Sequence, residues 1–364
     1  MDTTDPNIVF DDEGICNHCE EYKNIRAAHS YMGEQSDNTF NSLISKIKAK
    51  GKNKNYDCVV GLSGGIDSSY VAYIAKKNGL RVLGVHMDNG WNSEEAVQNI
   101  KNIAKILDID YESHVLDWEE FKDIQLAFLK ASIPEADTPT DIAILSSLHR
   151  IASKYGINYI LSGGNFATEG ILPKYWHYNA KDLTYFQTIQ NTFGTKRIKS
   201  FPTFGFRSEM YFKLILNIKM IYLLNYIPFD KSEAVKILEK EINWKNYGPK
   251  HHESQYTAFI QSYYLYKKFN IDYRKATLSS QICAGTISRP EALKILQTKP
   301  YDDSKIAKEI EYIAKKLGIT KESLSEIIDS EPKWYVEFSN DEKWLNYVYN
   351  TYRKVFKKEK LGNF

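Results

Sequence analysis

The sequence has few cysteines and almost no net charge, and each absence excludes a class of protein. Four cysteines in 364 residues are too few for the disulfide framework of a secreted scaffold. The 48 Lys and Arg residues against 46 Asp and Glu residues leave a formal charge of +2. No large basic field therefore indicates a nucleic-acid partner.

Long apolar runs are also lacking. The most apolar stretch, residues 210–229, is interrupted by polar side chains such as Lys213 and Asn217, which are costly at the centre of a bilayer. We predict a buried helix there and no contact with a membrane. The opening residues MDTTDPNIVFDDEG have neither the basic nor the apolar segment of a secretory signal, so we expect a cytoplasmic protein.

Strand and helix patterns alternate with short joints up to about residue 170. Strands are predicted at 56–62, 81–87, 111–116 and 158–163, and helices at 41–50, 67–78, 93–107, 118–130 and 140–155. This order predicts an α/β fold, an open parallel sheet with helices on both faces. We expect three parts: a cysteine-containing arm (1–30), an ATP-binding α/β domain (31–170) and a mainly α C-terminal part (171–364).

The stretch SGGIDSS, residues 63–69, follows the first predicted strand and opens a helix. Free amides at such a turn bind anions, and Gly64 and Gly65 let the backbone approach phosphate oxygens. Ser63, Ser68 and Ser69 add hydroxyl donors. The chain lacks both G-x-G-x-x-G and a Gly-Lys-Ser/Thr loop, so neither common nucleotide fingerprint applies. The alternative is a Gly-Ser turn that only caps a helix.

SGGIDSS resembles the pyrophosphate-binding loop (PP-loop) of the ATP pyrophosphatase superfamily, whose members split ATP between its α and β phosphates. The resemblance implies that the loop binds the phosphates and that Asp67 acts through Mg²⁺. The next strand end, GVHMDNGW, would bind the adenosine part through His86 and Asp88. After the fourth strand, LSGGNFATEG would place further residues near the phosphates, with Glu169 as a second Mg²⁺ ligand: Gly163, Gly164, Asn165 and Glu169.

The segment 243–293, together with DDEGICNHC and SGGIDSS, is similar to the N-acetyl sugar amidotransferase family. Members turn an acetamido group of a bacterial surface sugar into an acetamidino group, as in O-antigen or pseudaminic-acid biosynthesis. The resemblance implies that two runs contribute to the site. Catalytic roles are expected for Lys250, His251, Glu253 and Lys275, and substrate binding for His252, Asp272 and Arg274. The alternative for each residue alone is a solvated helix surface.

Cys16 and Cys19 have the C-x-x-C spacing of half a zinc site, but tetrahedral zinc needs two more ligands. His18, His29 or Cys283 could supply one. We expect either a zinc ion there or an arm without metal. Cys58 lies inside an apolar strand, where we expect it to pack in the core.

The resemblance implies that ATP adenylates the acetamido oxygen of a nucleotide sugar or nonulosonic acid, and that ammonia then displaces AMP. No nucleophilic cysteine for a glutaminase is recognisable in the chain. The resemblance implies that a separate HisH-like glutaminase, with a HisF-like companion, supplies the ammonia. Two alternatives remain. A tRNA-thiolating enzyme would use the same adenylation, and a non-catalytic subunit would only bind the nucleotide.

Overall fold

The computed structural model describes residues 1–29, 34–246 and 253–356. In these ranges five strands form one sheet in the order β3-β2-β1-β4-β5, and every neighbouring pair is parallel. The strands are β1 (Cys58–Gly61), β2 (Val82–Asp88), β3 (Asp110–Val115), β4 (Tyr159–Ser162) and β5 (Lys219–Tyr222). The predicted open parallel sheet is confirmed. The order reverses between β1 and β4, which is where ligands bind in such sheets.

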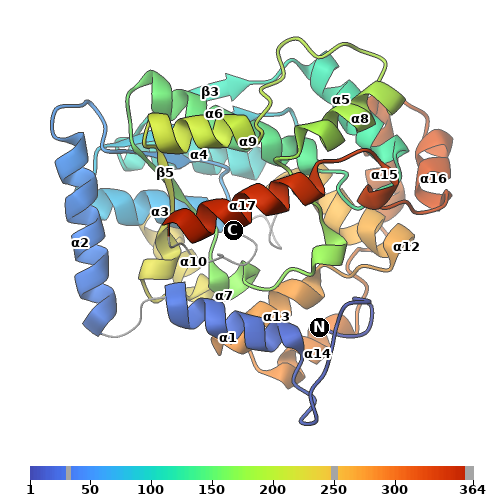
Figure 1. Cartoon of the computed structure of the whole chain (residues 1–364), viewed down its shortest axis with the longest axis horizontal. Coiled ribbons are helices and arrows are strands. Elements are labelled where there is room, and N and C mark those ends of the chain that lie inside the picture. The colour runs from blue at the N-terminus through green and yellow to red at the C-terminus, as the bar shows by residue number, and fades with distance from the viewer. Residues whose placement is uncertain (30–33, 247–252, 357–364) are drawn as a thin grey trace.

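Helices cover both faces of the sheet (Figure 1). Along β1, Cys58 and Val60 face the cluster that contains α3, whereas Val59 faces the cluster that contains α6, because successive side chains alternate across a strand. The helices of this unit are α2 (Glu34–Gly51), α3 (Ile66–Lys77), α4 (Glu94–Ile106), α5 (Trp118–Lys130) and α6 (Thr138–Lys154). Cys58 is fully buried, as predicted.

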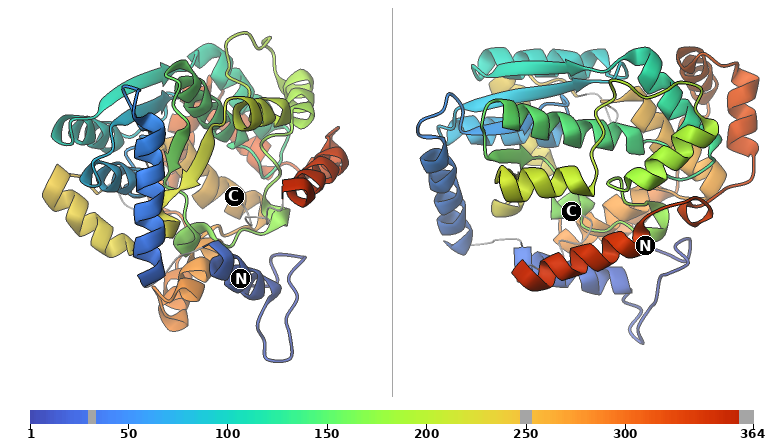
Figure 2. Two further views of the ribbon diagram at one scale, coloured as in Figure 1. Left: turned by 60° about the vertical axis from the view of Figure 1, so that its left-hand side comes forward. Right: turned by 45° about the horizontal axis from the view of Figure 1, so that its top comes forward.

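The second half of the chain is mainly helical, as expected. Its α-helices are α7 (Phe166–Glu169), α8 (Leu183–Phe193), α9 (Phe206–Met210), α10 (Lys231–Ile242), α11 (Gln255–Phe259), α12 (Leu265–Phe269), α13 (Arg274–Ala284), α14 (Arg289–Leu296), α15 (Ile306–Leu317), α16 (Lys321–Asp329) and α17 (Glu342–Phe356). Short 3₁₀ or π turns lie at Lys174–Trp176, Tyr211–Ile215, Leu223–Tyr226, Ile260–Tyr264 and Tyr335–Glu337. The last helix, α17, crosses the outside of the molecule in all views (Figures 1 and 2).

The prediction of one buried helix over residues 210–229 is wrong. The chain leaves the π turn at Ile215, takes a left-handed conformation at Asn217 (φ 49°) and then forms β5 beside β4. A left-handed residue interrupts a right-handed helix, and asparagine adopts that conformation more readily than most residues. The sheet therefore continues past residue 170, where sequence patterns placed the end of the α/β domain.

The two halves share one hydrophobic core. Side chains of α5 and α6 pack in the same cluster as Tyr256, Tyr264 and Leu317 of the C-terminal part. The arm carries α1 (Asn17–His29), which lies beside α13 (Figure 1). No helix in the described ranges is long and apolar enough to cross a membrane.

Candidate active site

The SGGIDSS stretch forms the turn from β1 into α3, at the carboxyl edge of the sheet. Gly65 is the N-cap of α3, and no side chain caps this end. The serines are bonded within the loop: Ser63 Oγ lies 3.0 Å from Ser68 Oγ and accepts the Gly65 N–H at 3.2 Å, while Ser69 Oγ donates to the Gly65 carbonyl at 2.6 Å. A helix N-terminus without a side-chain cap is suited to binding phosphate oxygens.

Glycine is required at position 64 for two reasons. Its φ is +79°, a conformation that costs other residues energy. A Cβ at this position would also lie 2.3 Å from the carbonyl oxygen of Ala96, in the first turn of α4. The loop is thus pressed against α4.

The second glycine pair lies against the first loop. A Cβ on Gly163 would come within 2.9 Å of the backbone of Asp67 and of Ser68, so no larger residue fits without displacement. Asn165 caps α7, accepting the Thr168 N–H at 3.0 Å and donating to the Gly163 carbonyl at 3.2 Å. These contacts bring together the turns after β1 and β4, as the sequence predicted.

Asp67 and Glu169 are the carboxylates that could hold Mg²⁺ here. Asp67 lies in the first turn of α3 and Glu169 ends α7, one on each side of the reversal in strand order. Magnesium is usually bound by one or two protein carboxylates together with substrate phosphates, so this donor set fits the ion.

At the end of β2, His86 and Asp88 are engaged within the protein. His86 is 8% exposed, and its Nδ1 donates to the Leu62 carbonyl at 2.9 Å. The amide nitrogen of Asn92 lies 3.2 Å from Nε2 of the same ring. Asp88 accepts the Gly90 N–H at 2.9 Å. Both side chains shape the strand end, and their adenosine contacts stay a prediction.

Two carboxylates that the sequence patterns did not single out lie at the start of α6. Asp137 accepts hydrogen bonds from Thr140 Oγ1 at 2.6 Å and from Thr257 Oγ1 at 2.7 Å. The Asp141 side chain is accessible to solvent, but desolvation by the protein around it, and then the charges of Asp137 and Glu169, raise the pKa of Asp141 to about 7. The available signal was positional, because a helix that precedes a parallel strand begins at the carboxyl edge of the sheet.

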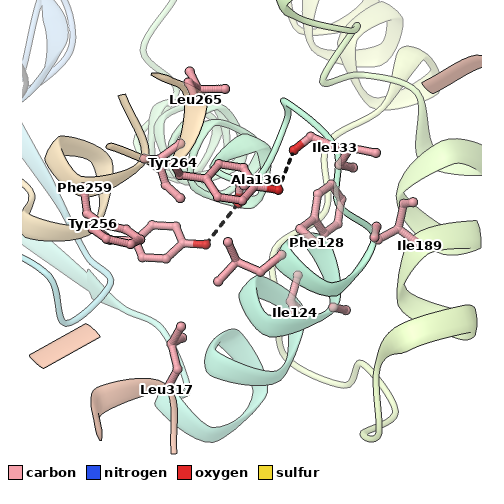
Figure 3. Packing of buried hydrophobic residues seen from close by; sticks show 14 of the residues in the cluster. Ile124, Phe128, Ile133, Ala136, Ile189, Tyr256, Phe259, Tyr264, Leu265 and Leu317 are labelled. Atoms are coloured by element: carbon pink, nitrogen blue, oxygen red, sulfur yellow. Dashed lines mark hydrogen bonds between the residues drawn. The ribbon is translucent and has the colours of Figure 1, made fainter. Parts of the chain in front are cut away.

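The C-terminal part fixes the peptide that leads into Asp137. Tyr256 donates to the Ala136 carbonyl at 3.3 Å, and Tyr264 donates to the Ile133 carbonyl at 3.1 Å. Both tyrosines are fully buried among apolar side chains (Figure 3). The second half of the chain therefore positions one wall of the candidate site.

Lys250, His251 and His252 lie outside the described residues, but the chain on either side is anchored at this edge. Upstream, the Lys245 N–H donates to Asn99 of α4 at 2.7 Å. Downstream, the Glu253 carbonyl accepts the N–H of Ser93, the N-cap residue of α4, at 2.8 Å. Glu253 thus lies next to the strand ends, as its predicted catalytic role requires.

The Asp-x-Arg-Lys run has contacts of a different kind. Asp272 and Arg274 form a bidentate ion pair, with nitrogen–oxygen distances of 2.9 and 2.7 Å. The guanidinium also donates to the Thr298 carbonyl at 2.7 Å, just after α14. Lys275 pairs with Asp2 of the arm at 2.7 Å. These side chains join α13 to α14 and to the arm, and nothing in their contacts supports substrate binding or catalysis.

The arm cysteines meet a third thiol. Cys16 Sγ lies 3.5 Å from Cys19 Sγ. Burial raises the pKa of Cys283 in α13, and a hydrogen bond with Cys19 acts in the opposite direction. No group of three or more His, Cys, Asp or Glu side chains within ranges 1–29, 34–246 and 253–356 could hold a metal ion. The described donors therefore do not make a tetrahedral zinc site.

Of the two histidines considered as further zinc ligands, only His18 has a described side chain. His18 Nε2 lies 2.6 Å from Asp5 Oδ2, so its ring is paired with a carboxylate of the arm. The side chain of His29 lies outside the described part of the structure.

Two family models match separate parts of the chain. A model described as "LPS biosynthesis protein WbpG-like, C-terminal domain" matches residues 253–354, and one described as "NAD synthase" matches residues 37–157. The first match begins at Glu253, whose carbonyl accepts the N–H of Ser93, the N-cap residue of α4.

Curated relatives match about a third of the chain. The tRNA-specific 2-thiouridylase MnmA of Nitratiruptor sp. is 32% identical over 138 residues, covering 35% of this chain and 40% of that protein. A probable mitochondrial tRNA-specific 2-thiouridylase of Caenorhabditis elegans is 29% identical over 140 residues, covering 34% and 36%. The chain thus spans two fifths or less of the length of these relatives.

Solved structures show weaker likeness. The NH3-dependent NAD synthetase of Campylobacter jejuni is 19% identical with a TM-score of 0.31, covering 56% of this chain and 84% of that chain. The NMN synthetase of Francisella tularensis is 16% identical with a TM-score of 0.31, covering 61% and 96%. Scores this low carry no argument.

The SGGIDSS turn, the sheet order and the NAD synthase match define a PP-loop protein of the ATP pyrophosphatase superfamily, a class of enzymes that use ATP. Within this class, the WbpG-like C-terminal domain at residues 253–354 indicates the family. The chain belongs to the WbpG-type family of PP-loop proteins, which is linked to lipopolysaccharide biosynthesis. The family recognised from the sequence is thereby confirmed.

Proposed function

We propose that the chain is an ATP-dependent amidotransferase that replaces the acetamido oxygen of a nucleotide-activated or acidic N-acetyl sugar with nitrogen. One observation carries the proposal. Through its backbone carbonyl, Glu253, where the WbpG-like domain begins, is hydrogen-bonded to Ser93, the N-cap of α4, at the edge of the sheet that holds the PP-loop. ATP chemistry and the lipopolysaccharide-linked domain therefore meet at one place.

The reaction follows from the poor leaving ability of an amide oxygen. The acetamido oxygen attacks the α phosphorus of ATP, the bond to pyrophosphate breaks, and an O-adenyl imidate forms. Ammonia then adds to the imidate carbon, and AMP leaves with the oxygen. The loop amides and serines orient the β and γ phosphates for the first step, and this positioning accounts for most of the catalysis expected of them.

Asp67 and Glu169 would hold Mg²⁺, which supplies neutralisation of the phosphate charge when bound. Glu253 and the Lys250, His251 and His252 run stay candidates for proton transfer and sugar binding. Ammonia would come from a separate HisH-like glutaminase with a HisF-like companion. Cys58 is enclosed in β1, and the other three cysteines gather where the arm meets α13, which favours an external source.

The test supplies ammonium in place of a glutaminase. The chain is incubated with ATP, Mg²⁺, ammonium and a panel of UDP-linked N-acetyl sugars, with the matching sugar that lacks the acetamido group as the control. We expect AMP and pyrophosphate only with the acetamido sugars, together with a product in which NH has replaced O. ADP and phosphate as the products would contradict adenylation.

A second candidate, tRNA thiolation, is favoured by the curated relatives, which are named as tRNA-specific 2-thiouridylases. Their matches cover at most 40% of those proteins and at most 35% of this chain in these two cases. Unmodified tRNA in the same assay separates the two candidates, because AMP formation that depends on tRNA and not on sugar would favour thiolation.

A further inference from the structure

The carbonyl oxygen of Gly64 is held by two buried side chains from outside the PP-loop. The indole N–H of Trp244 donates to it at 3.1 Å, and Nδ2 of Asn99 donates to it at 3.2 Å. Trp244 is 3% exposed and Asn99 is fully buried. Rotating this peptide would leave two buried donors unpaired, which is costly, so its orientation is fixed.

Asn99 uses its whole amide group in this arrangement. Its second N–H donates to the Lys245 carbonyl at 2.9 Å, and its Oδ1 accepts the Lys245 N–H at 2.7 Å. Both donors and the acceptor of the side chain are therefore occupied. Through this one residue, the PP-loop is joined to the segment that follows α10.

We propose that Trp244 and Asn99 are positioning residues of the PP-loop, and this inference rests on the ATP chemistry proposed above. A peptide unit is planar and trans, so its N–H points away from its carbonyl. Fixing the Gly64 oxygen inward turns the N–H of Gly65 to the opposite side, where it now donates to Ser63 Oγ at 3.2 Å. The two side chains thereby fix the direction of the Gly65 N–H at the start of α3, so that it already faces the place where the phosphates of ATP would bind.

The positioning role and a purely structural role predict different results when one donor is removed. Loss of a positioning contact changes ATP binding, whereas loss of a purely structural contact changes only stability. If the two side chains orient the loop, removing one donor lowers the affinity for ATP and raises its KM, because the loop has to be ordered when ATP binds. The KM for the sugar and the kcat at saturating ATP should stay near the wild-type values. If the bonds only hold α3, α4 and α10 together, the unfolding midpoint falls and ATP affinity does not.

The first experiment compares Trp244→Phe with Trp176→Phe by calorimetric titration of ATP with Mg²⁺. Trp244→Phe keeps the ring in the core and removes only the N–H that reaches the loop. Trp176 is 2% exposed, and its indole nitrogen has no hydrogen-bond partner among the described residues. We expect about tenfold weaker ATP binding for Trp244→Phe, the size of one buried hydrogen bond, and no change for Trp176→Phe.

The second experiment compares Asn99→Ala with Asn102→Ala. Asn102 lies on the same helix and donates to the Asn243 carbonyl at 2.8 Å, so it binds the same segment without reaching the loop. We expect only Asn99→Ala to weaken ATP binding. If Asn99→Ala does not fold, Trp244→Phe decides the question alone.

The outcomes separate this inference from the proposed function. A wild-type protein that binds no ATP would overturn the ATP chemistry itself. A wild-type protein that binds ATP, with Trp244→Phe binding it equally well, would overturn the positioning role and leave the ATP chemistry standing.

Discussion

Gly163, after β4, lies directly against the backbone of Asp67, in the first turn of the helix after β1. A Cβ at Gly163 would be 2.9 Å from the carbonyl carbon of Asp67, closer than such atoms approach in real structures. The two turns that form the candidate ATP site therefore depend on each other's position.

Gly163→Ala should push the PP-loop out of place. We expect ATP binding to weaken by about tenfold or more, because overpacking shifts the backbone that presents the amides. Titration calorimetry measures this. Gly61→Ala is the matched control, since a Cβ there would meet Leu148 at an ordinary 3.4 Å. Unchanged binding in Gly163→Ala would show that the two turns move apart at no cost.

Ser63→Ala and Asp67→Ala should each lower turnover by about tenfold or more while the fold stays intact, because phosphate positioning acts mainly on the transition state. Steady-state AMP release and a thermal melt measure the two quantities. Asp110→Asn is the control, since Asp110 begins β3 at the opposite edge of the sheet. Near-normal turnover in both loop variants would remove the PP-loop from the mechanism.

Asp141→Asn should stabilise the protein more at pH 8 than at pH 5. Burial and the charges of Asp137 and Glu169 raise the pKa of Asp141 from 3.8 to about 7. The folded state therefore holds a proton that the unfolded state has lost, and this carboxylate costs stability increasingly as the pH rises from about 4 to 7. Urea midpoints at the two pH values measure the change.

Asp123→Asn is the comparison variant for Asp141→Asn, because the pKa of Asp123 is lowered in the folded protein whereas that of Asp141 is raised. Burial acts to raise the pKa of Asp123, but hydrogen bonds from Thr195, Lys196 and Gln190 outweigh it and hold the pKa below 3.8. The stability that the Asp123 carboxylate contributes is present above pH 3.8 and is lost only as the pH falls through the lower pKa of the folded state. Asp123→Asn should therefore destabilise the protein about equally at pH 5 and pH 8. The same pH trend in both variants would contradict these assignments.

Zinc should be bound weakly, if at all, by the described cysteines. Cys16, Cys19 and Cys283 are near one another, but the described residues provide no complete ligand set. Metal analysis after dialysis should find well under one zinc per chain, and Cys19→Ser should change that content little. Full, tightly held zinc that is lost in Cys19→Ser would show that the arm is a structural metal site whose binding contributes to folding.

Local patterns predicted four of the strands and most of the helices flanking them. Those segments are continuous apolar runs or amphipathic repeats, so their own residues decide the structure, as in α5 at Trp118–Lys130. β5 was missed because its neighbours are as apolar as a buried helix, and only pairing with β4 makes it a strand. Periodicity does not report pairing across the chain.

The sequence predicted the local turns of the candidate site, but not the contacts between residues far apart in the chain. The Gly and Ser residues of the two turns are visible in the sequence because each turn needs them locally. Trp244 and Asn99 were not visible, because Trp244 reaches Gly64 from 180 positions away in the sequence. The position of Asp137 and Asp141 at the start of α6 could be read from the sequence, but the influence of Glu169 on Asp141 could not, because it depends on how α6 packs against its neighbours.

The contact between the arm and α13 has a consequence for the order of events during synthesis. Tyr22 of α1 packs against Gly170 at the end of α7, while Arg26 of the same helix donates to the Cys283 carbonyl, 257 residues further along. A ribosome adding about 5–20 residues per second needs roughly 13–50 s to cover that interval. The arm therefore leaves the ribosome well before α13, the helix that supports it. The turn that carries Asn165 and Glu169 is therefore among the late parts of the molecule to become fixed, and a nascent chain stalled before α13 should not yet bind ATP as the finished protein does.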